Sequence, residues 1–122
     1  MKLILASTSR YRRELLSRLH VAFDTVAPGI DEAARPGERP GPLSLRLSLE
    51  KAIAVAQSHP DAVVIGSDQT ATIDGMTSIG KPGTHERAVA QLLAASGREL
   101  VFHSSMAVVR LDRKSTRLNS SH

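Results

Sequence analysis

The segment VVIGSDQTATIDGMTSIGKP runs from Val63 to Pro82. It begins inside a continuous apolar run, AVVIGS at residues 62–67, which is typical of a strand in a sheet covered on both faces. Asp68 follows this run directly. Because open α/β sheets bind ligands beyond the carboxyl ends of their strands, an acid here indicates a functional site. A turn aspartate that accepts a bond from a backbone N–H is the alternative.

Helix and strand signals alternate along the chain and predict an α/β fold with a mixed, twisted sheet and flanking helices. A Pro- and Gly-rich loop of fifteen residues at 28–42 is long enough to be functional. There is no internal repeat or linker, so a single domain is expected over residues 1–111. The expected elements are strands at residues 2–6, 22–27, 62–67, 70–73, 76–79 and 99–111, a hairpin turn at Asp74-Gly75, and helices that follow Ser9, span residues 45–56 and run from Thr84 to Gly97.

The chain has 122 residues, of which 41% are apolar and 23% charged, and this composition is typical of one globular domain. It contains no cysteine, which excludes disulfides and thiolate metal sites and favours a reducing compartment. The apolar run in MKLILASTS, at residues 1–9, is too short for a signal-peptide core, and no run approaches the length of a membrane span. We therefore expect a cytoplasmic protein that does not enter a membrane.

The last eleven residues, DRKSTRLNSSH at 112–122, differ in character from the rest of the chain. They have no apolar periodicity and carry three basic residues against one acid. They resemble translated vector or adapter sequence, so we expect a non-native tail, with a disordered basic tail as the alternative. The strand expected before this tail runs directly into it without a covering element, as in a truncated gene.

Two motif tests around Asp68 narrow the chemistry. GMTSIGK, at residues 75–81, fits most of a P-loop, but Pro82 supplies neither the hydroxyl nor the N–H that such a loop requires. A P-loop is therefore excluded. The spacing Asp68-x-Thr70-x-Thr72 resembles the nucleophile motif of haloacid-dehalogenase-type phosphohydrolases, in which Asp68 would accept a phosphoryl group. The usual glycine of that motif is an alanine here, so this phosphohydrolase is kept as an alternative.

A turn rich in hydroxyl groups and arginines opens the first helix, in LASTSRYRRELLSRL at residues 5–19. Arginines at a helix N-terminus oppose the helix dipole, whereas anions bind there, so their presence indicates a phosphate site. Ser7 and one or two of the arginines can face such a site. A basic surface helix is the alternative.

Five segments together resemble, in order and spacing, the signatures of the Maf family of nucleotide pyrophosphatases. They are LASTSRYRRELL at 5–16, IDE at 30–32, EKA at 50–52, IGSDQ at 65–69 and GKP at 80–82. The resemblance covers Met1 to about Leu111, and SDQ in place of ADT is similar to the 7-methyl-GTP pyrophosphatase branch. It implies a Maf/ITPase-like fold, of which this chain would be the N-terminal part of two lobes. It also implies hydrolysis of a nucleoside triphosphate to the monophosphate and pyrophosphate with Mg²⁺ or Mn²⁺, and a possible homodimer when full length.

The same resemblance implies roles for single residues. Asp68 matches the proton acceptor that would activate the attacking water. The metal would be held by Glu32 and Asp68, the phosphates by Ser7, Arg12, Lys51 and Lys81, and the base would be selected by Tyr11 and Gln69. An aromatic face suits 7-methylguanine because methylation at N7 makes this base cationic. A partly buried surface tyrosine and a turn glutamine are the alternatives for the two specificity positions.

Two departures from the family concern the turn and the length. Arg10 stands where the family usually has proline, so the turn before the helix is expected to differ. The family's C-terminal half, with a glutamine that helps to select the base, has no counterpart in these 122 residues. We therefore expect weak activity, or none, from this chain by itself.

A small basic module that binds nucleic acid is the non-enzymatic alternative. The aromatic residues that such a module needs for stacking are few: Tyr11, Phe23 and Phe102. We therefore expect no stable nucleic-acid binding. The histidines show no ligand spacing, so a zinc site is not expected either.

Overall fold

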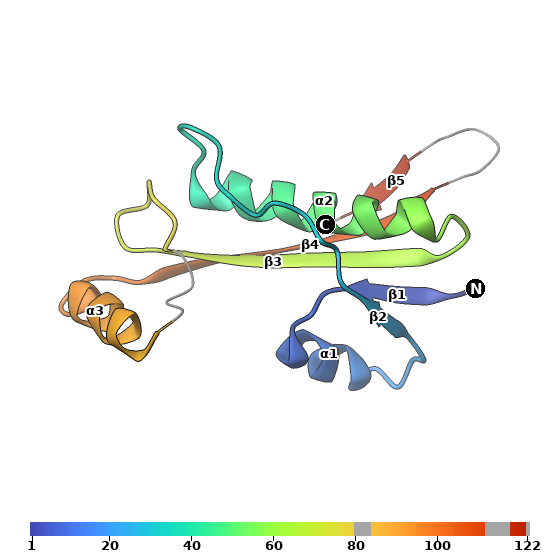
Figure 1. The fold of residues 1–122 in the computed structure, drawn as a ribbon, viewed down its shortest axis with the longest axis horizontal. Coiled ribbons are helices and arrows are strands. Elements are labelled where there is room, and N and C mark those ends of the chain that lie inside the picture. Colours follow the sequence, from blue (N-terminus) through green and yellow to red (C-terminus); the bar gives the residue numbers. More distant parts are fainter. Residues whose placement is uncertain (80–83, 112–117, 122) are drawn as a thin grey trace.

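The computed structural model describes residues 1–79, 84–111 and 118–121 and shows an α/β arrangement built on one mixed sheet (Figure 1). Five strands lie in the order β2-β1-β3-β4-β5. β1 is parallel to β2 and β3, whereas β3 with β4 and β4 with β5 are antiparallel, so the predicted fold class is confirmed. The elements are β1 (Leu3–Ala6), α1 (Arg10–Ser17), β2 (Asp24–Val26), α2 (Pro40–Ser58), β3 (Val63–Thr72), α3 (His85–Ala95), β4 (Val101–Leu111) and β5 (Leu118–Ser121).

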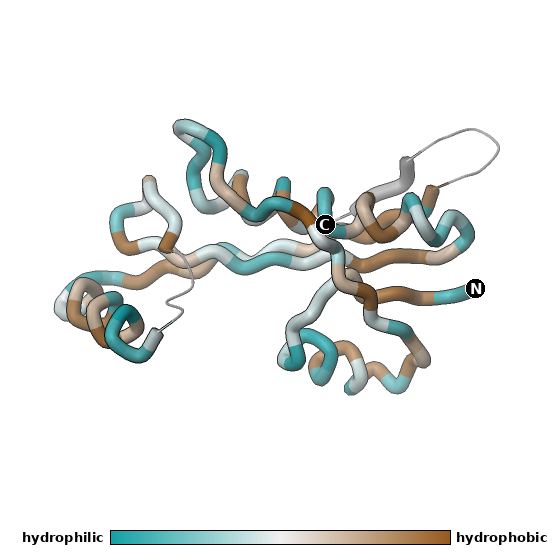
Figure 2. Tube along the Cα trace, in the orientation of Figure 1, coloured by the Kyte–Doolittle hydropathy of each residue, from teal (hydrophilic) through white to brown (hydrophobic). Residues whose placement is uncertain are grey.

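The hydrophobic core lies between α2 and one face of the sheet. Burial alternates along β3 with the period of two that a strand requires, and the inward-facing set contacts α2. The core is formed by Ile4, Ala6, Ala52, Val55, Ala56, Ala62, Val64 and Val109. Figure 2 shows that apolar residues gather on β1 and the first half of β3, whereas the middle of β3 is polar. The molecule therefore has an apolar end and a polar centre under the same helix.

Gly66 sets the distance between α2 and β3. A Cβ at this position would lie 2.0 Å from the carbonyl oxygen of Ser48 and 2.9 Å from the amide nitrogen of Ala52. Both atoms belong to the backbone of α2, so they cannot move aside as a flexible side chain can. The glycine in the IGSDQ segment is therefore required by close packing of the helix on the strand.

The register of the sheet explains why polar groups meet at the carboxyl ends of β1 and β2. β1 pairs Ala6 with Gly66, so β1 ends where Ser67 and Asp68 begin on β3. Asp68 pairs with Ser105 of β4 on the other side. The chain leaves β1 and β2 at this same end of the sheet, because both strands run parallel to β3. The segment after β1 and the loop at residues 27–39 are thereby brought next to Asp68, as expected for a ligand site in an open sheet.

The structure differs from the prediction in the region after Gly66. The strands predicted at 62–67 and 70–73 form one strand, because β4 pairs with β3 without interruption from Val64 to Thr72. Residues 76–79, predicted as a strand, do not form one, and Ile79 makes only an isolated bridge to Ala71. The polar residues that seemed to end the first strand are instead accommodated inside it.

A bend lies at the predicted hairpin turn, Asp74-Gly75, but the second strand of the hairpin does not follow it. Gly75 has a φ of +77°, which glycine adopts without strain. The Oδ1 of Asp74 accepts bonds from the backbone amides of Met76 and Thr77, both at 2.8 Å. These amides are therefore engaged by a side chain and do not pair with β3.

Three further differences concern burial and element boundaries. α2 begins at Pro40, inside the loop predicted at 28–42, because proline suits the first turn of a helix. Only the α2 face of β3 is fully buried, since Val63 and Ile65 on the other face are half-buried. Leu118–Ser121 forms β5 on β4, within the stretch predicted to be a non-native tail. That origin stays a prediction, and residues 112–117 and 122 lie outside the described part of the chain.

Candidate functional site

The centre of the site is an ion pair between α2 and β3. Lys51 Nζ lies 2.9 Å from Oδ1 of Asp68, and both side chains are only 6% exposed. Lys51 also lies 3.4 Å from the carbonyl oxygen of Ser67. A buried charge is tolerated only when an opposite charge or several hydrogen bonds compensate it. The pairing therefore explains how a lysine and an aspartate occupy interior positions of a helix and a strand.

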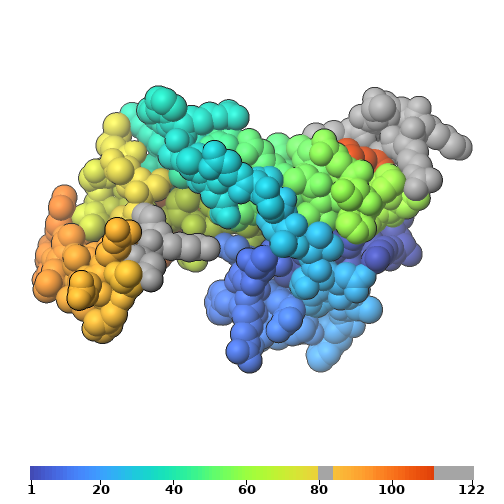
Figure 3. All heavy atoms as spheres, in the orientation of Figure 1, coloured from blue at the N-terminus to red at the C-terminus, as the bar shows by residue number. Residues whose placement is uncertain are grey.

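A second carboxylate reaches Lys51 from the loop between β2 and α2. Oε1 of Glu32 lies 3.0 Å from Lys51 Nζ, and the Glu32 side chain is 50% exposed. In Figure 3 this loop lies across the middle of the molecule, over α2 and β3. The ammonium group thus links two carboxylates from different elements. Predicted residues from three segments, IDE, EKA and IGSDQ, meet in this way.

One oxygen of the central aspartate has no partner within the part of the chain that the structure describes. Oδ2 of Asp68 is buried and has no hydrogen-bond partner among the described residues. Buried polar atoms in native proteins are nearly always hydrogen-bonded to protein, water or a ligand. This carboxylate oxygen is therefore available to accept a proton or a hydrogen bond, or to hold a cation.

These groups line a cavity of about 490 Å³, a volume suited to a small molecule. Five of the predicted site residues lie on its wall, from α1, the β2–α2 loop, α2 and β3. The lining residues are Arg12, Glu32, Ala33, Ala34, Leu43, Leu47, Lys51, Asp68, Gln69, Thr70, Ser78 and Ile79. The cavity combines two cationic side chains, Arg12 and Lys51, with two carboxylates, Glu32 and Asp68.

The other three predicted site residues lie elsewhere. Ser7 lines a different cavity, of about 240 Å³, together with Thr8, Ser9, Arg10, Arg13 and Thr25. Its Oγ accepts a bond of 2.9 Å from the amide of Ser9, whose own hydroxyl caps α1. Tyr11 is 69% exposed and lines neither of these cavities. Lys81 lies outside the described residues.

Hydroxyl groups that were not predicted from the sequence form hydrogen bonds around the backbone of Asp68. Ser44 Oγ lies 3.1 Å from the carbonyl oxygen of Asp68 and 2.8 Å from Ser105 Oγ. Thr70 Oγ1 donates to the carbonyl oxygen of Pro40 at 2.8 Å. These bonds join α2 to β3 and β4 across the polar part of the interface. Because serine and threonine are common at exposed helix and strand positions, no local pattern marks them as buried.

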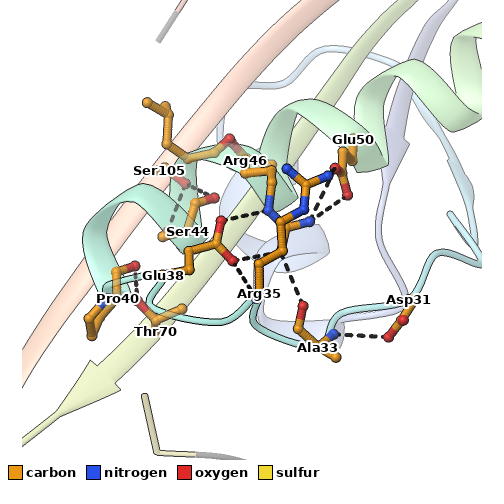
Figure 4. A network of polar contacts seen from close by, with 12 residues as sticks. Asp31, Ala33, Arg35, Glu38, Pro40, Ser44, Arg46, Glu50, Thr70 and Ser105 are labelled. Atoms are coloured by element: carbon orange, nitrogen blue, oxygen red, sulfur yellow. Dashed lines mark hydrogen bonds and ion pairs between the residues drawn. The ribbon is translucent and has the colours of Figure 1, made fainter. Parts of the chain in front are cut away.

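A second polar network, also missed from the sequence, surrounds Arg46 on α2 (Figure 4). Arg46 Nε and Nη2 lie 2.6 and 2.7 Å from the two carboxylate oxygens of Glu38, and Nη1 lies 2.9 Å from Oε1 of Glu50. The bond from Arg46, followed by that from the amide of Arg35, lowers the pKa of Glu38 to about 2. The i,i+4 spacing of Arg46 and Glu50 is the one signal that the sequence carried for this network.

Among the described residues no group of three or more histidine, cysteine, aspartate or glutamate side chains is placed to hold a metal. A pair of carboxylates, Glu32 and Asp68, is present at the cavity, and hard oxygen donors of this kind suit Mg²⁺ or Mn²⁺. No helix within the described ranges is both long and apolar enough to cross a membrane.

The sequence of this chain is similar to one family and to a group of curated proteins that share one name. The profile of a family described as Maf-like protein matches residues 2–122. A 7-methyl-GTP pyrophosphatase of Bordetella pertussis is 63% identical over 107 residues, covering 88% of this chain and 53% of the relative. Proteins of the same name from Xanthomonas axonopodis pv. citri and Polaromonas sp. are 58% and 57% identical, covering 93% and 90% of this chain and 59% and 50% of theirs. The chain spans about half the length of the curated relatives it matches.

Proposed function

Because the chain belongs to the Maf family, we propose that it forms part of a nucleoside triphosphate pyrophosphatase whose substrate is 7-methyl-GTP. The observation that carries this proposal is the match, over nearly all of this chain, to relatives named 7-methyl-GTP pyrophosphatase. The cavity supports it independently, because its cationic groups and carboxylates suit a triphosphate bound with a divalent metal. In the proposed reaction, water attacks the α-phosphorus, the bond to the bridging oxygen of the β-phosphate breaks, and monophosphate and pyrophosphate leave.

Asp68 is proposed as the general base of this reaction. Its buried Oδ2 is free to accept the proton of the attacking water, while its Oδ1 stays bound to Lys51. The hydrogen bond from Lys51 fixes the orientation of the carboxylate, and the Ser44 hydroxyl supports the backbone behind it. Asp68 is thereby positioned before the substrate binds, which is what efficient proton transfer requires.

Cationic side chains are proposed to bind the phosphates. Arg12 and Lys51 line the cavity and can neutralise the charge that develops on the leaving pyrophosphate. Lys81 is proposed for the same role. Ser7 and the hydroxyl groups near it would bind phosphate oxygens from their separate cavity at the start of α1.

Glu32 and Asp68 would hold the divalent metal, since both contribute carboxylate oxygens to the same cavity. Asp68 would use Oδ1 for the metal, so that Oδ2 stays available for the proton of the water. A bound Mg²⁺ or Mn²⁺ would supply charge neutralisation and orientation of the phosphates. Lys51 bridges the two carboxylates, so it holds them together when no cation lies between them.

Gln69 and Tyr11 are proposed to select the base. Gln69 lines the cavity directly after Asp68, and its amide would bind the edge of a purine there. Tyr11 would contribute a cation–π contact to the methylated ring. We further propose that the protein is cytoplasmic, acts as a homodimer and does not bind nucleic acid stably.

The two alternative functions are less well supported. In the haloacid-dehalogenase reading, the threonines of Asp68-x-Thr70-x-Thr72 would take part in the site. Their hydroxyls instead bind the carbonyl oxygen of Pro40 and the carboxylate of Asp74. The relatives named as pyrophosphatases favour neither this alternative nor a nucleic-acid-binding module.

The proposal is tested with a chimera in which residues 1–111 of this chain are joined to the remaining C-terminal part of the Bordetella pertussis relative. The chimera is assayed with 7-methyl-GTP, GTP, dTTP and UTP in the presence of Mn²⁺. Faster release of pyrophosphate from 7-methyl-GTP than from the other nucleotides is expected. Release of inorganic phosphate alone, or trapping of an aspartyl phosphate on Asp68, would support the dehalogenase-type reaction instead.

A further inference from the structure

We propose that Arg46 is a positioning residue that fastens the β2–α2 loop to α2 and so places Glu32 beside Lys51 and Asp68. The inference rests on the proposed function, in which Glu32 holds a metal at this cavity. Arg46 itself does not line the cavity, so it would act on the site through the loop.

The geometry of the guanidinium group supports this role. Two of its nitrogens engage both carboxylate oxygens of Glu38, at 2.6 and 2.7 Å, and a third lies 2.9 and 3.1 Å from the oxygens of Glu50. Nη2 also donates to the carbonyl oxygen of Ala33 at 3.1 Å. Glu38 belongs to the end of the loop, Glu50 to α2, and Ala33 is the residue after Glu32. One side chain therefore connects both parts of the loop to the helix that carries Lys51.

The loop depends on these polar contacts because it has little apolar burial. Residues 31–37 are all exposed, whereas the Arg46 and Glu38 side chains are only 16% and 12% exposed. Within the loop, the amide of Ala33 binds the carboxylate of Asp31, and the amide of Arg35 binds that of Glu38. These bonds shape the loop. Two single ion pairs also join it to α2, Glu32 with Lys51 at 3.0 Å and Arg35 with Glu50 at 3.6 Å, whereas Arg46 contributes several hydrogen bonds to two points of the loop. A lysine cannot reproduce the forked contact to Glu38 and the simultaneous contacts to Glu50 and Ala33.

The first test measures the position of the loop without a metal. Lys51 is buried under Glu32, so its acylation by an amine-reactive ester reports how often the loop moves away, with exposed Lys2 as the internal reference. In the 122-residue chain, Arg46→Gln and Arg46→Lys are expected to raise labelling of Lys51 several-fold while labelling of Lys2 is unchanged. Glu14→Gln, which breaks the exposed i,i+4 pair with Arg10, is the matched control and should change neither. Circular dichroism verifies that each variant is folded.

The second test measures Mn²⁺ affinity of the same proteins by electron paramagnetic resonance. Arg46→Gln is expected to weaken binding by about 10–100-fold, the usual effect of removing a residue that orients a metal ligand. If Arg46 acts through Glu32, Arg46→Gln in the Glu32→Gln background should cause no further loss. A merely structural role would give additive losses.

Each outcome of the two tests is decisive. Wild-type labelling of Lys51 in Arg46→Gln would overturn the positioning role, as would additive losses of Mn²⁺ affinity. If Glu32→Gln and Asp68→Asn leave Mn²⁺ affinity unchanged, the metal site of the proposed function is wrong. The labelling experiment then decides the role of Arg46 independently, because it needs no metal.

Discussion

At the scale of the residue, the account depends on three charged groups and one free oxygen. Lys51 compensates the buried charge of Asp68 and contacts Glu32, while Oδ2 of Asp68 has no partner in residues 1–79, 84–111 and 118–121. Such an arrangement is costly to fold, because two charges leave water for the interior. A costly buried ion pair beside a cavity is typical of a site whose charges bind a ligand or react with it.

Removal of Lys51 should therefore destabilise the protein strongly. Lys51→Met leaves the carboxylate of Asp68 buried without its cation, and breaking a buried pair in this way costs about 3–5 kcal/mol of unfolding free energy. Asp68→Asn should lower the unfolding free energy by less. The new amide oxygen can still accept the hydrogen bond from Lys51, and Lys51 remains paired with Glu32. Urea unfolding at pH 7 measures both values. A Lys51→Met variant as stable as the wild type would show that the pair is not formed.

At the scale of the element, the close contact of α2 with β3 builds the site. Gly66 lets the helix approach, and the same contact brings Lys51 over Asp68 and Ser44 under it. A shift of α2 away from the strand would separate the ion pair. Stability and site geometry are therefore coupled through this single packing contact.

Gly66→Ala should be destabilising by about 1–3 kcal/mol or more, because the new Cβ would meet the backbone of α2. Gly41→Ala, on α2 itself, is the matched control. Its Cβ would meet only the side chain of His103, at 3.3 Å, which can move. Urea unfolding of the two variants is compared with the wild type. Equal stability of the two alanine variants would contradict the observed helix–strand distance.

The loop that carries Glu32 should become acid-sensitive through Glu38. The hydrogen bond from Arg46 lowers the pKa of Glu38 from 4.5 to about 2. The folded state thus binds this proton less readily, so the contribution is fully present above pH 4.5 and is lost as the pH falls towards 2. Glu38→Gln should be less stable than the wild type at pH 6, and the two stabilities should converge towards pH 2.

Unfolding free energies at several pH values between 6 and 2 give this comparison. Asp74, whose pKa is also lowered to about 2 by the amides of Thr77 and Met76, contributes to the slope in both proteins and does not affect the difference. A constant difference between Glu38→Gln and the wild type across this range would contradict the ion pair.

The elements with a clear period were predictable from the sequence, and the polar ones were not. β1, β2, β4, α1 and α3 lie within or next to their predicted ranges because apolar spacing and the Ser9 and Thr84 caps mark them. The sequence predicts two strands here because Ser67 to Thr70 interrupt the apolar run. In the structure these polar residues stay inside β3, because α2 supplies hydrogen-bond partners for Asp68 and Thr70. Five site residues could be brought to one cavity only by knowing the family signatures. The Arg46 network joins residues on separate elements, which no local pattern reveals.

At the scale of the whole molecule, the described chain is a sheet with one well-covered face. α3 exposes Val89, Leu92 and Leu93, and β4 exposes Phe102 near it. The cavity is likewise open, since Glu32 is half exposed and Gln69 is exposed. The residues that the structure describes therefore leave the groups lining the cavity accessible to water.

The 122-residue chain should consequently turn over 7-methyl-GTP more slowly than the chimera extended by the C-terminal part of the Bordetella pertussis relative. Both proteins contain the same cavity residues. The difference between their kcat values therefore measures the effect of the C-terminal part that the chimera adds. Pyrophosphate release is measured for the two proteins at equal concentration. Equal kcat values in monomeric solution would show that the 122 residues are sufficient, and the prediction of a non-native tail at residues 112–122 would then have to be reconsidered.

The most direct test of the central claim is the effect of Asp68→Asn on the chimera. The kcat for pyrophosphate release from 7-methyl-GTP should fall by about 10²–10⁴-fold, the usual effect of removing a general base. Nucleotide affinity, measured by isothermal titration calorimetry, should be largely retained because Arg12 and Lys51 remain. A variant whose kcat stays within about tenfold of the wild type would contradict the assignment of Asp68 as the proton acceptor.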